Sequence, residues 1–231
     1  MHKKINYKKK YYNFQSLLKK LYNIEDLSLL HKKLESNYSI PDNLEGLGKD
    51  TNSIFHNIFY KKLDSGWAEM QELYDKFIID IVKPLFPKEK ELIYQSFPSF
   101  RIHYPNNRAI TTIHTDGDKN HCHPFGEINF VMPITKMYGS NAIWAETSPG
   151  LGDFTPMEGE FGDLFIWNGN QCAHYNEINE TGLTRISFDF RVLPIKFYNP
   201  DYAKVTATTR KKFIIGDYYA CYRTNGEQNE V

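Results

Sequence analysis

Two histidines and one aspartate in this sequence have a spacing that is typical of a metal site. His114 and Asp116 are two residues apart, so on an extended segment both side chains point to the same side and can bind one ion. His174 follows 58 residues after Asp116, in a short strand-like context. Two imidazoles and one carboxylate form the donor set of non-haem Fe(II) sites, which leave positions open for further ligands, O2 among them. We therefore predict that these three residues are the catalytic metal ligands.

A candidate anion site lies on the next segment of the chain. Arg185 comes eleven residues after His174, and Ser187 shares its face if the segment is a strand. A guanidinium binds a carboxylate through two parallel hydrogen bonds, and a nearby hydroxyl adds a third. A molecule that chelates the metal through a 2-oxo acid and carries a second carboxylate would fit between His174 and Arg185.

Together, the His-x-Asp…His pattern and the downstream Arg-x-Ser resemble the 2-oxoglutarate- and Fe(II)-dependent dioxygenases over residues 97–193. The resemblance implies a double-stranded β-helix, the jelly-roll and cupin-like core, with Fe(II) at the three ligands. It also implies that Arg185 and Ser187 bind 2-oxoglutarate as cosubstrate, and that the enzyme hydroxylates an unactivated C–H bond. Residues 126–130 and 141–146 look like the streptomycin-biosynthesis StrG type, which suggests a small polar metabolite or natural-product intermediate as substrate.

Other polar or aromatic residues are candidates for binding cosubstrate or substrate. Asn129 shares a strand face with Glu127, so it either faces the site as a cofactor-binding residue or is an ordinary polar sheet residue. Arg101 and His103 alternate with apolar neighbours, which indicates a substrate-binding face or an exposed edge. His121 is expected near the mouth of the site. Trp144 is a further candidate substrate contact, although large aromatic residues are more often core.

A rival metal site lies close by in the sequence. His121, His123 and Glu127 have the ligand spacing of many cupins, and His174 would complete the set. The rival pattern lacks the glycine expected before its first histidine and the proline-glycine turn expected before its last. A third alternative is a non-catalytic barrel that binds a ligand in its cavity, because fold alone does not establish function.

The elements that must position these residues are mainly strands. Runs rich in β-branched and aromatic residues alternate with turn clusters and predict strands at 99–104, 110–114, 126–132, 142–146, 164–167, 172–175 and 184–193. In the last of these, apolar residues occupy one face, and Arg185, Ser187, Asp189 and Arg191 occupy the other. Such a strand either has one face in solvent or lines a site with its polar face.

The N-terminal part is expected to be mostly helical. Apolar residues recur at helical spacing between Phe14 and Tyr22 and again between Trp67 and Val82. Asp64 and Ser65 are the expected N-cap of the second helix, and Pro84 its expected end. We predict a single domain: a mostly helical part at 1–96 that buttresses the β-core at 97–193, and a C-terminal extension at 194–231.

Composition narrows the class of protein. The formal net charge is zero, which indicates no overall attraction to nucleic acid or to an anionic membrane. Three cysteines without CxxC spacing favour a reducing compartment, and no apolar run is long enough to span a bilayer. We therefore expect a cytoplasmic enzyme with a small-molecule substrate and neither a nucleic acid nor a membrane partner. The sequence does not indicate an oligomeric state.

Overall fold

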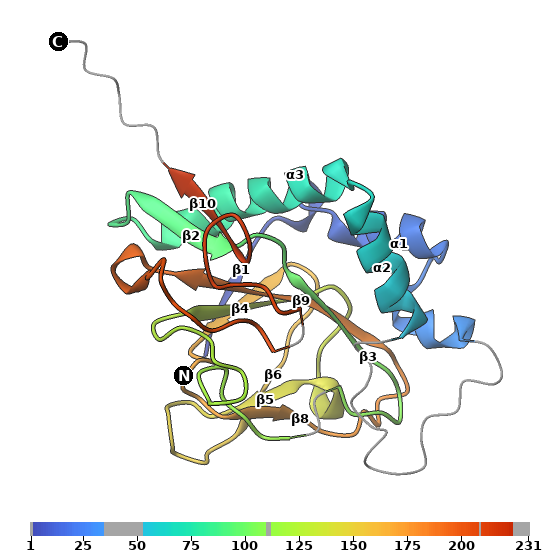
Figure 1. Ribbon diagram of the computed structural model, residues 1–231. Coiled ribbons are helices and arrows are strands. Elements are labelled where there is room, and N and C mark those ends of the chain that lie inside the picture. The colour runs from blue at the N-terminus through green and yellow to red at the C-terminus, as the bar shows by residue number, and fades with distance from the viewer. Residues whose placement is uncertain (1, 35–52, 110–111, 208, 224–231) are drawn as a thin grey trace.

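Two antiparallel sheets and a layer of helices make up the protein (Figure 1). A computed structural model describes residues 2–34, 53–109, 112–207 and 209–223. The larger sheet has the order β1 (Lys3–Asn6), β7 (Asp163–Trp167), β4 (Ile128–Pro133), β9 (Arg185–Leu193), β2 (Glu91–Gln95) and β10 (Tyr219–Arg223), and β3 (Ser99–His103) also pairs with β9. The smaller sheet has the order β6 (Thr155–Met157), β5 (Ile143–Ala145) and β8 (His174–Asn176). The fold is therefore mainly β and of the sandwich type.

Three α-helices cover the outer face of the larger sheet, on the side opposite the smaller sheet (Figure 1). They are α1 (Phe14–Tyr22), α2 (Ile54–Asp64) and α3 (Ala68–Phe77), and α3 continues as a π-helical turn (Ile78–Val82) and a 3-10 turn (Lys83–Leu85). Further 3-10 turns lie at Lys9–Tyr11, Leu27–Lys33, Gly139–Asn141 and Ile195–Phe197. Within the described ranges, none of these helices has the length and apolar character needed to cross a membrane.

β9 is the central strand of the core, and all nine of its residues are buried. Phe188 on its outer face packs against Phe14 of α1 at 5.7 Å and Phe59 of α2 at 5.9 Å between ring centroids. Phe190 stacks on Phe130 of β4 at 4.9 Å. The polar residues of β9 point the other way, and all of them except Ser187 line a pocket between the two sheets. The sequence allowed the polar face of this strand to be either exposed to solvent or the lining of a site. In the structure this face is buried and borders the pocket.

The helix boundaries differ in part from those predicted. The helix at Phe14–Tyr22 is confirmed, with Asn13 as N-cap and Asn23 in left-handed geometry at its end. The predicted N-cap at Asp64 and Ser65 is wrong, because Asp64 ends α2 and the Ser65 hydroxyl donates to the Lys62 carbonyl. The chain turns there, and α3 begins only at Ala68.

Six of the predicted strands are present as β3, β4, β5, β7, β8 and β9. The one predicted at 110–114 lies partly outside the described residues. Its described part contributes a single β-bridge from His114 to His174, not a strand. Four strands of the structure, β1, β2, β6 and β10, were not predicted from the sequence. Of these, β1, β2 and β10 add strands to the larger sheet from the parts expected to be helical or an extension.

Candidate metal centre

The two candidate histidine ligands lie side by side on one rung of backbone pairing. The His114 amide donates to the His174 carbonyl at 3.2 Å, and the His174 amide donates to the His114 carbonyl at 2.9 Å. Since paired residues of antiparallel strands project to the same face, both imidazoles enter the pocket together, and their ring centroids are 4.2 Å apart. The pairing thus joins two residues that are distant in the sequence.

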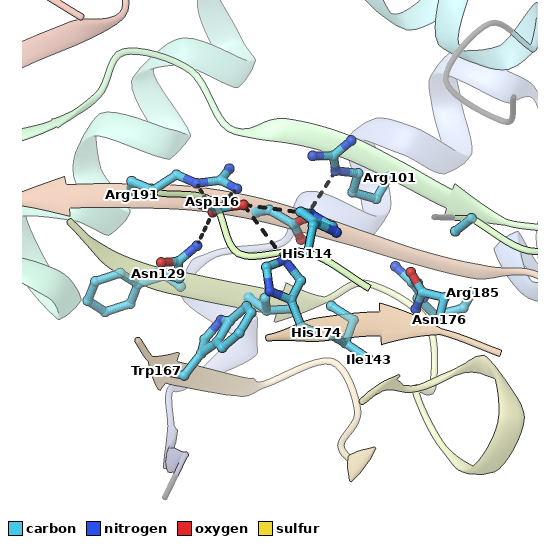
Figure 2. Close-up of a pocket in the computed structure, with 14 residues that line it drawn as sticks. Arg101, His114, Asp116, Asn129, Ile143, Trp167, His174, Asn176, Arg185 and Arg191 are labelled. Atoms are coloured by element: carbon cyan, nitrogen blue, oxygen red, sulfur yellow. Dashed lines mark hydrogen bonds and ion pairs between the residues drawn. The ribbon is translucent and has the colours of Figure 1, made fainter. Parts of the chain in front are cut away.

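Asp116 is held beside them by the same pair of segments. Its amide donates to the Gly169 carbonyl at 2.9 Å, and the next amide, that of Gly117, donates to the Asn170 carbonyl at 3.0 Å. A Cβ on Gly117 would lie 2.7 Å from that Asn170 oxygen, so only glycine permits this approach. The Asp116 carboxylate therefore projects into the pocket between β9 and the two imidazoles (Figure 2).

The donor atoms of the three residues converge on one point. Asp116 Oδ1 lies 3.9 Å from His114 Nε2 and 3.7 Å from His174 Nε2. One ligand atom from each residue lies within 4.8 Å of the others, and within the described ranges this is the group of His, Cys, Asp and Glu side chains arranged to hold a metal ion. The geometry matches the set predicted from the sequence.

The tautomers and charges of these groups also suit a divalent metal. His114 Nδ1 lies 3.0 Å from the Thr112 carbonyl and His174 Nδ1 lies 3.1 Å from the Cys172 carbonyl. A carbonyl can only accept, so Nδ1 carries the proton and each Nε2 keeps its lone pair for a metal. Burial lowers the pKa of His114, and it lowers that of His174 to about 4, so both rings are neutral at neutral pH.

The second oxygen of Asp116 is tied to the sheet. Asp116 Oδ2 accepts hydrogen bonds from Asn129 Nδ2 at 2.7 Å, from Arg191 Nη2 at 2.7 Å and from Arg191 Nε at 3.2 Å. Burial alone would raise the pKa of Asp116, but the positive charge of Arg191 leads the opposing effects and holds that pKa well below its usual value. The carboxylate is therefore ionised at neutral pH.

Arg185 lies at the other end of the pocket from Arg191 (Figure 2), and Ser187 lies beside it. Arg185 is only 1% exposed, its Nε donates to the Asn141 carbonyl at 3.1 Å, and its Nη1 donates to Ser187 Oγ at 2.9 Å. These bonds fix the plane of the guanidinium inside the cavity. A carboxylate of a ligand that also reaches the metal centre would meet it there.

The candidate substrate residues on β3 differ from each other. Arg101 lines the pocket, and its Nε pairs with Asp189 Oδ2 at 3.0 Å. His103 pairs across the sheet with Arg185, but it is fully buried, does not line the pocket, and its Nε2 lies 2.8 Å from the Asn107 carbonyl. Burial lowers the pKa of His103 to about 3. The structure thus brings Arg101, but not His103, to the cavity.

Two further expectations need correction. Asn129 faces the pocket as predicted, but it lies at the Arg191 end, where its amide binds Asp116 instead of accompanying Arg185 and Ser187. Trp144 does not line the pocket. Its neighbours Ile143 and Ala145 face inward, so by the alternation of a strand Trp144 lies on the outer face of the smaller sheet, stacked on Tyr175 at 6.4 Å.

The residues of the rival cupin pattern are engaged elsewhere. His123 Nδ1 lies 2.7 Å from Glu127 Oε2, and the other oxygen of Glu127 accepts from the Tyr219 hydroxyl. His121 Nδ1 lies 2.9 Å from Asp118 Oδ1, and its ring stacks on His114 at 4.3 Å. Among the described residues, these side chains do not form a metal-binding group with His174. His121 does lie at the edge of the candidate centre, close to where the sequence placed it.

Of the charged and amide residues that line the pocket, three were not predicted as site residues: Asn176, Asp189 and Arg191. A signal for two of them was present, because Asp189 and Arg191 continue the polar face that begins at Arg185 and Ser187. Asn176 lies two residues after His174 on β8 and so shares its face, but the predicted strand ended at residue 175.

Comparison with known proteins gives one sequence relative and several remote structural ones. No family model matches the chain. The chain is 29% identical over 187 residues to the streptomycin biosynthesis protein StrG of Streptomyces griseus, a match that covers 77% of this chain and 85% of that protein. The similarity to the StrG type therefore extends from two short stretches to most of the sequence.

The similar solved structures have low sequence identity to this chain. A nickel complex of the non-haem monooxygenase ThoJ matches with 14% identity and a TM-score of 0.40 over 59% of this chain and 58% of that one. HygX from Streptomyces hygroscopicus, with nickel and 2-oxoglutarate bound, matches with 10% identity and a TM-score of 0.35 over 60% and 76% of the two chains. The chain thus spans less than two thirds of ThoJ, and both likenesses are remote.

Proposed function

We propose that this protein is a non-haem Fe(II) oxygenase that uses 2-oxoglutarate and O2 to hydroxylate an unactivated C–H bond of a small polar molecule. The proposal rests mainly on the convergence of His114 Nε2, His174 Nε2 and Asp116 Oδ1 in one pocket. The same pocket also holds the buried Arg185. In this proposal the two sheets form a double-stranded β-helix.

The donor set fits Fe(II), and when bound there the ion and its cosubstrate would supply the electrons that activate O2. The residues of the chain bind, orient and shield. His114, Asp116 and His174 hold the ion from one side, so ligands enter from the pocket. Arg185 and Ser187 bind the far carboxylate of 2-oxoglutarate and fix the direction in which its oxo acid end points.

Two other charged residues of the pocket, Arg101 and Asp189, are proposed to bind substrate. Arg101 and Asp189 present a cation and an anion side by side in the cavity, which suits hydroxyl, amine or carboxyl groups on a polar molecule. Apolar walls at Ile143 and Trp167 limit the water that reaches the centre. The relative StrG belongs to an antibiotic pathway by its name, and this supports a sugar-like or natural-product intermediate as the substrate class.

The test is an anaerobic titration of the metal-free protein with Fe(II) and then 2-oxoglutarate, observed through the weak visible metal-to-ligand charge-transfer band. The band is expected in the wild type and in a variant with both His121 and His123 changed to Ala. It should be lost in Asp116→Ala, whose circular dichroism should match that of the wild type.

A band retained in Asp116→Ala would overturn the assigned ligands. A band lost in the double histidine variant would favour the cupin site, and no band in any protein would favour a ligand-binding barrel. If the band forms as expected, O2-dependent conversion of 2-oxoglutarate to succinate then gives the assay for candidate substrates.

A further inference from the structure

We propose that Arg191 and Asn129 are positioning residues that make Asp116 bind the metal through one oxygen, Oδ1, and keep Oδ2 away from it. The inference rests on the proposed metal site. It goes further by assigning a task to two residues that touch neither the metal nor the substrate.

The contacts of the carboxylate divide sharply between its two oxygens. Oδ2 receives three N–H groups, two from Arg191 and one from Asn129, at 2.7 to 3.2 Å. Each carboxylate oxygen has about two lone pairs, so these donors saturate Oδ2. Oδ1 instead faces the two imidazole Nε2 atoms at 3.7 and 3.9 Å. Only Oδ1 has lone pairs available in the direction of a metal.

The donors come from the buried centre of the larger sheet. Asn129 of β4 and Arg191 of β9 are register partners on adjacent strands, and their exposed fractions are 3% and 6%. Asp116, in contrast, lies outside the named strands, on the segment that follows the His114 bridge. The sheet thus provides a fixed frame for a ligand that the local backbone alone does not orient.

The side-chain amide of Asn129 is oriented mainly by its hydrogen bond to Asp116. Its Oδ1 is buried and, among the described residues, has no hydrogen-bond partner. Turning the amide over would bring that oxygen against the Asp116 carboxylate, where two acceptors would repel each other. The side chain leaves one polar atom unsatisfied and keeps its N–H on the metal ligand.

The number of metal positions explains why one oxygen matters. Two histidines and one carboxylate oxygen would occupy three positions of a six-coordinate ion and would leave three open. A chelating 2-oxo acid would take two of these, and O2 would need the third. If Asp116 bound through both oxygens, it would take the position that O2 requires.

Charge and positioning predict opposite effects of removing the guanidinium, which makes the proposal testable. By charge alone, loss of a nearby cation should strengthen the binding of a dication. If Arg191 positions Asp116, its loss should weaken metal binding instead. Arg101 is the matched control, because it is a cation of the same pocket but pairs with Asp189 and not with Asp116.

The experiment measures the Fe(II) dissociation constant anaerobically against a competing chelator for the wild type, Arg191→Met, Asn129→Leu and Arg101→Met. Loss of partners that orient a metal ligand typically weakens metal binding by about 10- to 100-fold, and this is expected for Arg191→Met and Asn129→Leu. Arg101→Met should bind Fe(II) as tightly as the wild type or more tightly. Crystal structures with nickel should show Asp116 bound through Oδ1 in the wild type and through both oxygens in Arg191→Met.

The outcomes separate this inference from the proposed function. If the wild type binds no Fe(II), the proposed metal site fails and the inference fails with it. Suppose that the wild type binds Fe(II), and that Arg191→Met and Asn129→Leu bind it as tightly as the wild type with Asp116 still bound through one oxygen. In that case only the inference is overturned. Melting temperatures of the metal-free proteins report whether each variant folds, and Asn129→Leu, which changes no charge, decides the matter if Arg191→Met does not fold.

Discussion

Replacing Arg185 by Met should abolish tight binding of 2-oxoglutarate while leaving the metal site intact. The side chain is 1% exposed, and its guanidinium is oriented by the Asn141 carbonyl and the Ser187 hydroxyl. A ligand carboxylate in this pocket would be buried with its partner, and removing one member of such a pair costs about 2–5 kcal/mol. At about 1.4 kcal/mol per tenfold change, the affinity for 2-oxoglutarate should fall by between about 30-fold and several thousandfold.

The assay is a titration of the Fe(II)-loaded protein with 2-oxoglutarate, followed by the charge-transfer band. The methionine side chain in Arg185→Met is unbranched and similar in length to the aliphatic part of arginine, so the buried apolar contacts are retained. Arg185→Lys keeps the charge but loses the planar pair of donors, so its affinity should lie between those of Met and the wild type. Arg101→Met serves as the control, because Arg101 pairs with Asp189 and is assigned to substrate. Unchanged 2-oxoglutarate affinity in a folded Arg185→Met protein that still binds Fe(II) would refute the cosubstrate assignment.

Two further predictions concern stability and the segment that carries Asp116. Burial lowers the pKa of His56 from 6.5 to about 3, so below pH 6.5 the unfolded chain takes up a proton that the folded protein excludes, and the free energy of unfolding falls as the pH falls. His56→Phe should reduce that fall by up to about 1.4 kcal/mol per pH unit, measured by urea denaturation between pH 6.5 and 4.5; an unchanged slope would contradict the buried neutral state. Gly117→Ala places a Cβ 2.7 Å from the Asn170 carbonyl oxygen and should therefore displace Asp116. The Fe(II) affinity should then fall by about 10- to 100-fold, measured by competition with a chelator. Wild-type affinity in Gly117→Ala would mean that this close approach does not position the ligand.

The grouping of the three candidate ligand residues was predictable because their pattern is local or chemically distinctive. His114 and Asp116 share a side of one extended segment, and a second imidazole followed by Arg185 and Ser187 leaves few interpretations. The polar face of β9 was also readable, since strict alternation of side chains needs no knowledge of the partner strands.

The support for Asp116 was not predictable, because it depends on how β4 and β9 align. Asn129 and Arg191 become neighbours only through the register of the sheet, which joins segments over sixty residues apart. The direction of Trp144 has the same origin. It follows from the pairing of Ala145 with His174, and the sequence around Trp144 gives no sign of that pairing.

The missed strands show a different limit. β1 contains Lys3 and Lys4, and its exposed side chains resemble a solvated terminus. β10 is half-exposed and short, and its partner β2 lies in a region dominated by helices. Neither β1 nor β10 has a clear apolar face, so pairing with the neighbouring strand determines that these segments form strands.

The contact between Tyr219 of β10 and Glu127 has a consequence for how the protein is made. Glu127 also holds His123, whose amide donates to the Asp116 carbonyl, so the loop that starts at Asp116 is fastened in part by β10. Tyr219 follows Glu127 by 92 residues. At synthesis rates of about 5–20 residues per second, the ribosome adds it roughly 5 to 18 seconds later. A nascent chain can therefore pair β4 with β7 and present the three candidate ligands before this loop is secured, and the loop is fastened only after Tyr219 has been added.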